Sequence, residues 1–157
     1  MRRRTANLIV IVTLLSPLSP FDATRGQDKP GSSKATVTVR VTDLSNTRGM
    51  LRFGVFDQPK GFPRERAAAL LWLSLPADAA HPTFHVDLPP GRYAGVVLHD
   101  ENANEKLDTN FFGVPTEGHG VTNNPKPRRR PPRYDEAEFE LKLDGATLSI
   151  SVQYKYL

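Results

Sequence analysis

The chain has 157 residues, no cysteine and a formal net charge of +4. This length is typical of a single domain, and the absence of cysteine excludes disulfide bonds as its stabiliser. Three arginines lie at positions 2–4, so the rest of the chain is nearly neutral. A nearly neutral chain argues against nucleic acid as a partner, because proteins that bind nucleic acid usually present a clustered basic face.

The first residues have the features of a secretory leader. The arginines at positions 2–4 precede an apolar stretch over residues 8–15, and prolines and small residues follow it. This order predicts a signal peptide over residues 1–23. The apolar stretch is much shorter than the ~20 residues of a membrane-spanning helix, so no transmembrane segment is expected after cleavage. A retained membrane anchor is the alternative. The mature protein is expected in the periplasm or outside the cell.

Residues 24–34 are polar and rich in Gly and Ser, which is typical of a flexible linker. The folded domain is therefore expected over residues 35–157. Six segments of this domain alternate apolar and polar residues, or are rich in apolar residues, as strands do: Val37 to Val41, Leu51 to Val55, Phe84 to Leu88, residues 92–98, Ala137 to Leu143, and Leu148 to Tyr156. The turn residues 45–49 predict an opening hairpin, and Asp144-Gly145 predicts a second hairpin.

The segment from Pro63 to Leu75 is less regular. Pro63, Glu65, Arg66 and three alanines favour a short helix. A seventh strand is then expected near residues 71–75, with Trp72 filling the core.

These elements predict an all-β fold. Six or seven short antiparallel strands, each with one apolar face, must cover that face with a second sheet. We therefore expect a single two-sheet sandwich of prealbumin or immunoglobulin type, with one long loop rich in Asp and Asn. A barrel is the alternative.

The stretch between His99 and Tyr134 lacks strand periodicity and is longer than unstructured connections usually are in a compact domain. Its first part has the oxygen-ligand spacing of a calcium loop. Asp100, Asn102, Asn104 and Asp108 stand at relative positions one, three, five and nine, with the carbonyl of Lys106 at position seven. A bound Ca²⁺ would offset the repulsion among the acidic side chains of this segment.

Two positions depart from the calcium pattern. Glu105 replaces the Gly expected at position six, and Phe111 replaces the bidentate Glu expected at position twelve. Glu117 is the candidate substitute ligand. The alternative is that the Asp and Asn side chains cap turns by bonding nearby backbone N–H groups.

A larger set of motifs resembles a known family. The motifs are Leu88-Pro89-Pro90-Gly91-Arg92-Tyr93-Ala94, His99-Asp100-Glu101-Asn102-Ala103-Asn104, Leu107-Asp108-Thr109-Asn110, Gly113-Val114-Pro115-Thr116-Glu117-Gly118, Asn123-Asn124 and Pro131-Pro132. In this combination the chain from about Ala35 resembles the bacterial family called domain of unknown function 2141. The resemblance implies export and a sandwich fold. Family members typically carry Gly where this chain has Glu105.

Histidine and carboxylate side chains suggest an enzymatic alternative. His99, Asp100, Glu117 and His119 are candidates for a transition-metal site with an open position for water, as in a metal-dependent hydrolase. His81 and His85 form a second pair. The chain has no Gly-x-Ser-x-Gly, His-Glu-x-x-His or phosphate-binding Gly loop, so a non-catalytic role is the main prediction.

The run from Lys126 to Arg133 is basic and rich in proline. Arg128, Arg129, Arg130 and Arg133 are candidates for binding phosphate, lipid headgroups or acidic polysaccharide, which would make the protein an anion-binding adaptor. The alternative is a solvated loop, or one that lies against the acidic segment 100–108.

The sequence thus predicts an exported, non-catalytic binding or structural module. Ca²⁺ is the candidate cofactor of this module, and a transition metal belongs to the enzymatic alternative. The expected partner is an extracytoplasmic protein or polysaccharide.

Overall fold

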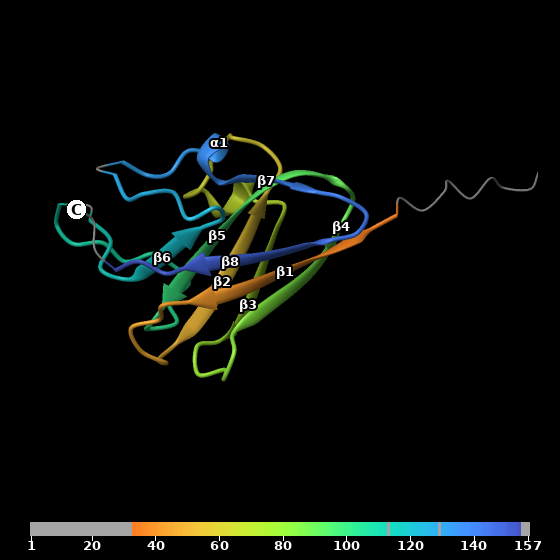
Figure 1. Ribbon diagram of the computed structural model, residues 1–157. Helices are drawn as coiled ribbons and strands as arrows, with labels where there is room; N and C mark the ends of the chain where they lie inside the picture. The colour runs from red at the N-terminus through yellow and green to blue at the C-terminus, as the bar shows by residue number, and fades with distance from the viewer. Residues whose placement is uncertain (1–32, 113, 129, 155–157) are drawn as a thin grey trace, which may run out of the picture. The chain divides into compact units, whose positions relative to one another are not determined.

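The computed structural model describes residues 33–112, 114–128 and 130–154 (Figure 1). The predicted signal peptide and most of the predicted linker lie outside the described residues. Gly31–Leu157 forms one compact unit. This unit contains both sheets and their hydrophobic clusters, so we expect it to fold without the preceding residues. No helix in the described part of the chain is long and apolar enough to span a membrane.

Strands dominate the domain. They are β1 (Ala35–Thr42), β2 (Met50–Phe56), β3 (Leu71–Pro76), β4 (Thr83–Leu88), β5 (Gly91–Asp100), β6 (Gly118–Val121), β7 (Glu138–Leu141) and β8 (Ala146–Ser151). Two short helices accompany them, the 3-10 helix η1 (Arg66–Ala68) and α1 (Tyr134–Ala137). The predicted all-β, two-sheet sandwich is confirmed, as is a short helix followed by a strand after Pro63. The strand missed by the sequence is β6, which lies inside the stretch predicted to lack strands.

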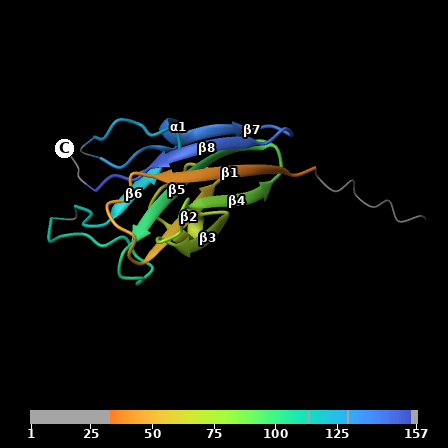
Figure 2. The ribbon, with the colours of Figure 1, turned by 60° about the horizontal axis from the view of Figure 1, so that its bottom comes forward.

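The strands form a three-stranded sheet in the order β4-β1-β8 and a larger sheet in the order β3-β2-β5-β6, with β7 also paired to β5 (Figures 1 and 2). The long strand β5 pairs with β2 along one edge. On its other edge it pairs first with β7, through Tyr93 and Phe139, and then with β6, through Leu98 and His119. Strand β5 is thus the centre of the five-stranded sheet.

Both predicted hairpins are wrong. Strands β1 and β2 belong to different sheets, and so do β7 and β8, so residues 43–49 and Asp144-Gly145 carry the chain from one sheet to the other. Strand β1 instead pairs antiparallel with β4 and parallel with β8, where Val39 faces Leu148. An alternating pattern specifies which face of a strand is buried but not which strand lies beside it.

The main core lies between the sheets. Alternate residues of β1 and β2 enter it, with Val37, Val39 and Leu51 fully buried. Phe53 of the larger sheet meets Phe84 of the smaller one, with ring centroids 5.3 Å apart. This facing of two apolar surfaces explains the period-two pattern of both strands.

A second hydrophobic cluster covers the outer face of the five-stranded sheet, where η1 and α1 lie against it. Its buried members are Phe56, Ala94, Val96, Val121, Tyr134 and Ala137. Trp72 belongs to this cluster rather than to the core between the sheets, contrary to the prediction. A Cβ atom on Gly54 would come within 2.7 Å of the Trp72 ring, so glycine at this position lets the indole pack closely against the backbone of β2.

Candidate functional site

The outer face of the five-stranded sheet also carries a pocket of about 500 Å³. Its apolar lining includes Trp72 of β3, Val96 and Leu98 of β5, and Val121 of β6. The walls come from residues 63–66 and from two loops. One is the Asp/Asn loop (residues 101–117), which joins β5 to β6, and the other is the Pro/Arg loop (residues 122–133), which joins β6 to α1. Charged lining residues are Arg52, Arg64, Arg66, Glu105 and Lys106.

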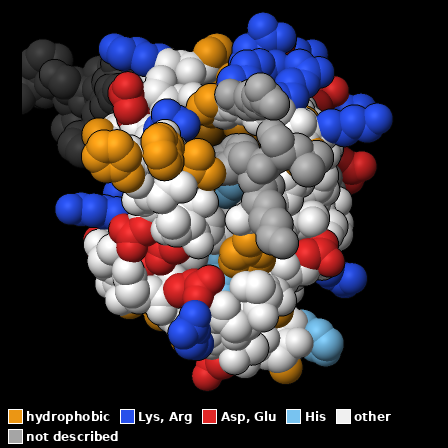
Figure 3. Space-filling model, turned by 90° about the vertical axis from the view of Figure 1, so that its left-hand side faces the viewer, with side chains coloured by type: hydrophobic (Ala, Val, Ile, Leu, Met, Phe, Trp, Pro, Cys, Tyr) orange, Lys and Arg blue, Asp and Glu red, His pale blue; other side chains and the backbone are white. Residues whose placement is uncertain are grey.

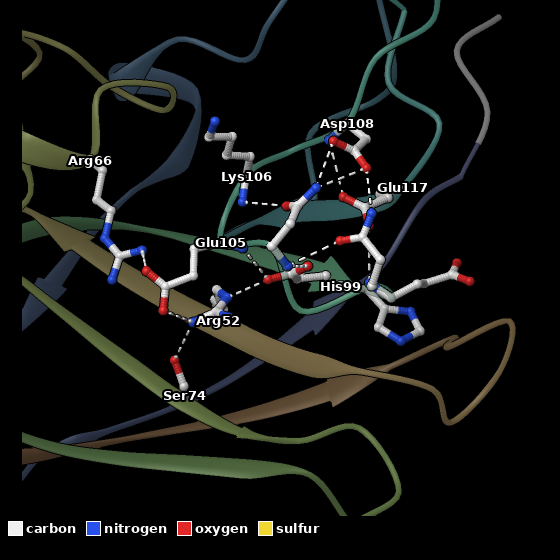
Figure 4. Close-up of polar contacts among 12 residues, drawn as sticks. Arg52, Arg66, Ser74, His99, Glu105, Lys106, Asp108 and Glu117 are labelled. Carbon is white, nitrogen blue, oxygen red and sulfur yellow. Dashed lines mark hydrogen bonds and ion pairs between the residues drawn. The ribbon is translucent and has the colours of Figure 1, made fainter.

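A buried ion pair lies where the Asp/Asn loop leaves the sheet (Figure 4). Arg52 Nε donates to Asp100 Oδ2 at 2.6 Å, and the two side chains are only 8% and 0% exposed. The backbone N–H groups of Asn104 and Glu105 also donate to this carboxylate, at 3.0 and 2.9 Å. Burial raises the pKa of Asp100, but these hydrogen bonds and the charge of Arg52 outweigh it and lower the pKa below its ordinary value. Asp100 therefore anchors the loop to β2 as a carboxylate.

Glu105 links the same loop to the far wall of the pocket. Its carboxylate oxygens lie 3.3 Å from Arg52 Nη1 and 3.1 Å from Arg66 Nη1 (Figure 4). The residue has φ +67°, in the left-handed region that favours glycine. Glu105 is therefore strained at a backbone position where glycine would not be, but it places a negative charge beside two arginines.

The remaining predicted loop ligands bond to one another. Asn102 Nδ2 donates to Asp108 Oδ2 at 2.6 Å, and Asn104 Nδ2 donates to both oxygens of Asp108 at 3.0 and 3.1 Å. Asn104 Oδ1 accepts the backbone N–H of Lys106 at 2.9 Å, while the Lys106 side chain points away from Asp108 (Figure 4). These are the turn-capping bonds that Asp and Asn commonly make.

Glu117 does fold back onto the loop, as its candidate role required. It accepts the backbone N–H of Glu101 at 3.0 Å through one carboxylate oxygen and that of Asp108 at 3.0 Å through the other. Its carboxylate thus closes the loop across 16 residues.

A Ca²⁺ site needs several oxygen ligands that converge on one point. Within residues 33–112, 114–128 and 130–154, no three His, Asp or Glu side chains form a group that could hold a metal ion. Asp108 nevertheless faces the side-chain amides of Asn102 and Asn104, and turning each amide half a revolution would replace its NH₂ by an oxygen. Calcium binding stays a prediction that requires this rearrangement.

The structure does not bring His99 and His119 together. In the β5–β6 pairing His119 lies opposite Leu98, whereas His99 lies opposite Gly118, so the two histidines point to opposite faces of the sheet. His99 is fully buried, and its Nε2 donates to Arg48 O at 2.8 Å while Nδ1 accepts from the Tyr154 hydroxyl at 2.6 Å.

His119 lines the pocket. Burial lowers its pKa, and the charge of Arg64 acts in the same direction, whereas a hydrogen bond with the Glu117 backbone opposes them. His119 is therefore a neutral side chain near pH 7. The second histidine pair lies elsewhere, exposed on and beside β4, where His85 Nδ1 is 3.2 Å from Thr38 Oγ1.

The arginines of the Pro/Arg loop are paired with α1 rather than with the segment 100–108. Arg128 and Arg130 contact Glu136 at 3.1 and 2.7 Å, and Arg133 contacts Asp135 at 3.4 Å. Hydrogen bonds from Arg130 and from the Arg133 backbone lower the pKa of Glu136 to about 2. Arg129 lies outside the described residues. Anion binding by this run would have to compete with these carboxylates.

Sequence reasoning missed Arg52, Arg64, Arg66 and Trp72 as parts of the site. The available signal was Arg52 itself, a cation at a strand position whose neighbours Leu51 and Phe53 are both apolar. Such a position normally faces solvent, and only the outer cluster and the loop bury it.

Comparison with protein families agrees with the motifs around the loop. Residues 39–149 match the family described as "uncharacterized protein conserved in bacteria" (DUF2141). The chain belongs to this family. Comparisons with curated proteins and with solved structures gave no match. The DUF2141 match includes the whole pocket lining, from Arg52 to Pro132.

Proposed function

We propose that this DUF2141 protein is an exported, non-catalytic binding module that holds a small anionic ligand with an apolar body. One observation carries the proposal, namely a pocket of about 500 Å³ that combines an apolar floor with cationic lining residues. Small-molecule sites usually measure about 300–1,000 Å³ and are mostly apolar, with a few polar groups that orient the ligand.

The charge balance of the lining favours an anion. Arg52 is neutralised by Asp100 and Glu105, and Arg66 also contacts Glu105. Among the described residues neither Arg64 nor Lys106 has a carboxylate partner. These two cations leave the pocket with a positive potential that a carboxylate or phosphate ligand would neutralise.

A binding role fits the way the candidate catalytic groups are used. Asp100, His99 and Glu117 each make hydrogen bonds that hold strands or loop backbone in place. Of the histidines and acids considered for catalysis, His119 is the one that lines the pocket, where it can donate or accept a hydrogen bond.

The Asp/Asn loop forms one wall of the pocket, and we include calcium in the proposal as an ion that would hold this wall in place. Export to the periplasm or the exterior is part of the same proposal and rests on the basic and apolar leader of the sequence. Fusion of residues 1–23 to a reporter active only outside the cytoplasm tests it, and a reporter that stays inactive would contradict it.

The pocket is tested by titrating residues 31–157 with octanoate and with octanol, which have equal chain length but differ in charge. Trp72 is the one tryptophan of the chain, so its fluorescence reports directly on the pocket. We expect octanoate to bind more tightly than octanol. Arg64→Glu and Lys106→Glu should each weaken octanoate binding by roughly fivefold to tenfold, and Glu105→Gln should strengthen it.

The matched control is Arg40→Glu, which reverses an exposed cation on the other sheet and should leave binding unchanged. Equal affinity for octanoate and octanol, or equal weakening by Arg40→Glu, would refute the proposed anion site.

A further inference from the structure

The tip of the Asp/Asn loop exposes two adjacent aromatic side chains. Phe111 is 97% exposed and Phe112 is 84% exposed. The rings contact each other edge to face, with centroids 5.5 Å apart. Val114 beside them is exposed as well. An apolar group of this size on a loop tip is a common mark of an interaction surface.

Hydrogen bonds join the described residues on either side of the tip. Asn110 N donates to Val114 O at 2.8 Å, and Thr116 N donates to Asp108 O at 2.9 Å. The Asn110 side-chain oxygen accepts the N–H groups of Phe112 and Val114, both at 3.0 Å. Phe112 and the residues that flank the two phenyl groups are therefore held by hydrogen bonds.

The chemistry of the tip fits a lipid surface. Residues 109–116 contain no charged side chain, so the tip can enter the headgroup and acyl boundary without burying a charge, which membranes strongly disfavour. Two exposed cations accompany the tip, Lys106 just before it in the chain and Lys126 on the neighbouring Pro/Arg loop. An apolar tip bordered by Lys and Arg is typical of proteins that dock on anionic membranes.

The arrangement of the two loops supports this geometry. The Asp/Asn and Pro/Arg loops project from the same end of the sandwich (Figures 1 and 2). Seen from that end, hydrophobic side chains stand at the surface close to Lys and Arg side chains (Figure 3). We propose that Phe111 and Phe112 insert into an anionic lipid surface while the neighbouring cations contact its headgroups. Neither phenylalanine lines the pocket, so this proposal does not depend on the ligand that the pocket binds.

The test is co-sedimentation of residues 31–157 with vesicles of phosphatidylcholine and phosphatidylglycerol in equal parts. The wild-type domain should sediment with the vesicles. Phe111→Ser combined with Phe112→Ser should lower its partition coefficient at least about tenfold, because two side chains lose their apolar burial. Lys126→Glu, made alone in the wild-type domain, should also weaken binding to these vesicles.

Leu143→Ser is the matched control. Leu143 is 64% exposed in the β7–β8 turn, at the opposite end of the sandwich (Figure 1), and its replacement should leave partitioning unchanged. The phenylalanine variant should unfold at the wild-type temperature, because the two rings contact chiefly each other and water.

Three results would overturn the proposal. The wild-type domain could remain in the supernatant, or the double variant could sediment as fully as the wild type. The third is self-association of the wild type in the absence of vesicles that the double variant abolishes, which would assign the tip to a contact between two copies of the chain.

Discussion

At the scale of single residues, the Arg52–Asp100 pair holds the site together. An ion pair taken out of water stabilises a protein only when further hydrogen bonds satisfy both groups. Here Arg52 also donates to Ser74 Oγ at 3.2 Å, and Asp100 accepts two backbone N–H groups. The pair therefore connects β2, β3, the end of β5 and the Asp/Asn loop.

Replacing Asp100 by Asn should be strongly destabilising. The substitution removes the fully buried carboxylate that faces Arg52 and leaves the more exposed Glu105, at 3.3 Å, as its remaining acidic partner. Loss of a buried partner of this kind costs about 3–5 kcal/mol of the free energy of unfolding. Chemical denaturation of residues 31–157 measures it. Asp144→Asn, at an exposed turn position, is the control and should change stability little, and a similar small effect of Asp100→Asn would contradict the buried-pair interpretation.

The Asp100 carboxylate also makes the stability of the domain depend on pH. The pKa of Asp100 is lower in the folded protein than its ordinary value of 3.8, so its stabilisation is present above that value and is lost as the pH falls through the folded pKa. In Asp100→Asn, the free energy of unfolding should therefore fall less on acidification than it does in the wild type.

At the scale of elements, the sequence indicated the long Asp/Asn loop but gave no sign of β6. The loop uses local hydrogen bonds between residues two to six positions apart, such as Asn102 to Asp108, and spacing alone can indicate these. Strand β6 reads Gly-His-Gly-Val and has no apolar alternation. Its glycines allow close approach to β8, because a Cβ on Gly120 would come within 2.5 Å of Ser151 O.

Calcium binding by the loop has a direct test in thermal unfolding. If the amides of Asn102 and Asn104 turn their oxygens toward Asp108, excess calcium should raise the unfolding temperature of residues 31–157 by several degrees relative to chelator. Asp108→Asn should abolish that shift, and Asp135→Asn should retain it. Identical unfolding in calcium and in chelator would show that the loop is closed by its own hydrogen bonds.

At the scale of the whole domain, two sets of bonds join the sheets along one side. His119 on β6 exchanges backbone hydrogen bonds with Gln153 beyond β8, at 3.0 and 2.8 Å. Near it the Tyr154 hydroxyl donates to buried His99 and accepts the backbone N–H of Ser45 at 3.1 Å. The sandwich is therefore partly closed at this edge, in the direction of the barrel that was its alternative.

Tyr154→Phe should weaken this closure. The change removes the donor to His99 Nδ1 and leaves a buried nitrogen without its bond, which costs about 1–3 kcal/mol. Equilibrium denaturation should show a lower midpoint with an unchanged slope. Tyr93→Phe is the comparison on β5, the strand that also carries His99, since it removes a part-buried hydroxyl that donates to Pro89 O at 2.8 Å. A larger loss of stability there than at Tyr154 would contradict the bridging role.

The sequence by itself determined the strand class, most strand positions and the Asp/Asn loop, because period-two alternation and Asp/Asn turn bonds are local properties of the chain. Only the tertiary structure decided which strands pair, that His99 and His119 face opposite sides, and that Arg52, Trp72 and Lys106 line one pocket. These features depend on contacts between residues tens of positions apart, such as Arg52 and Asp100. A local pattern cannot specify such contacts, since the same buried face can pair with several partners.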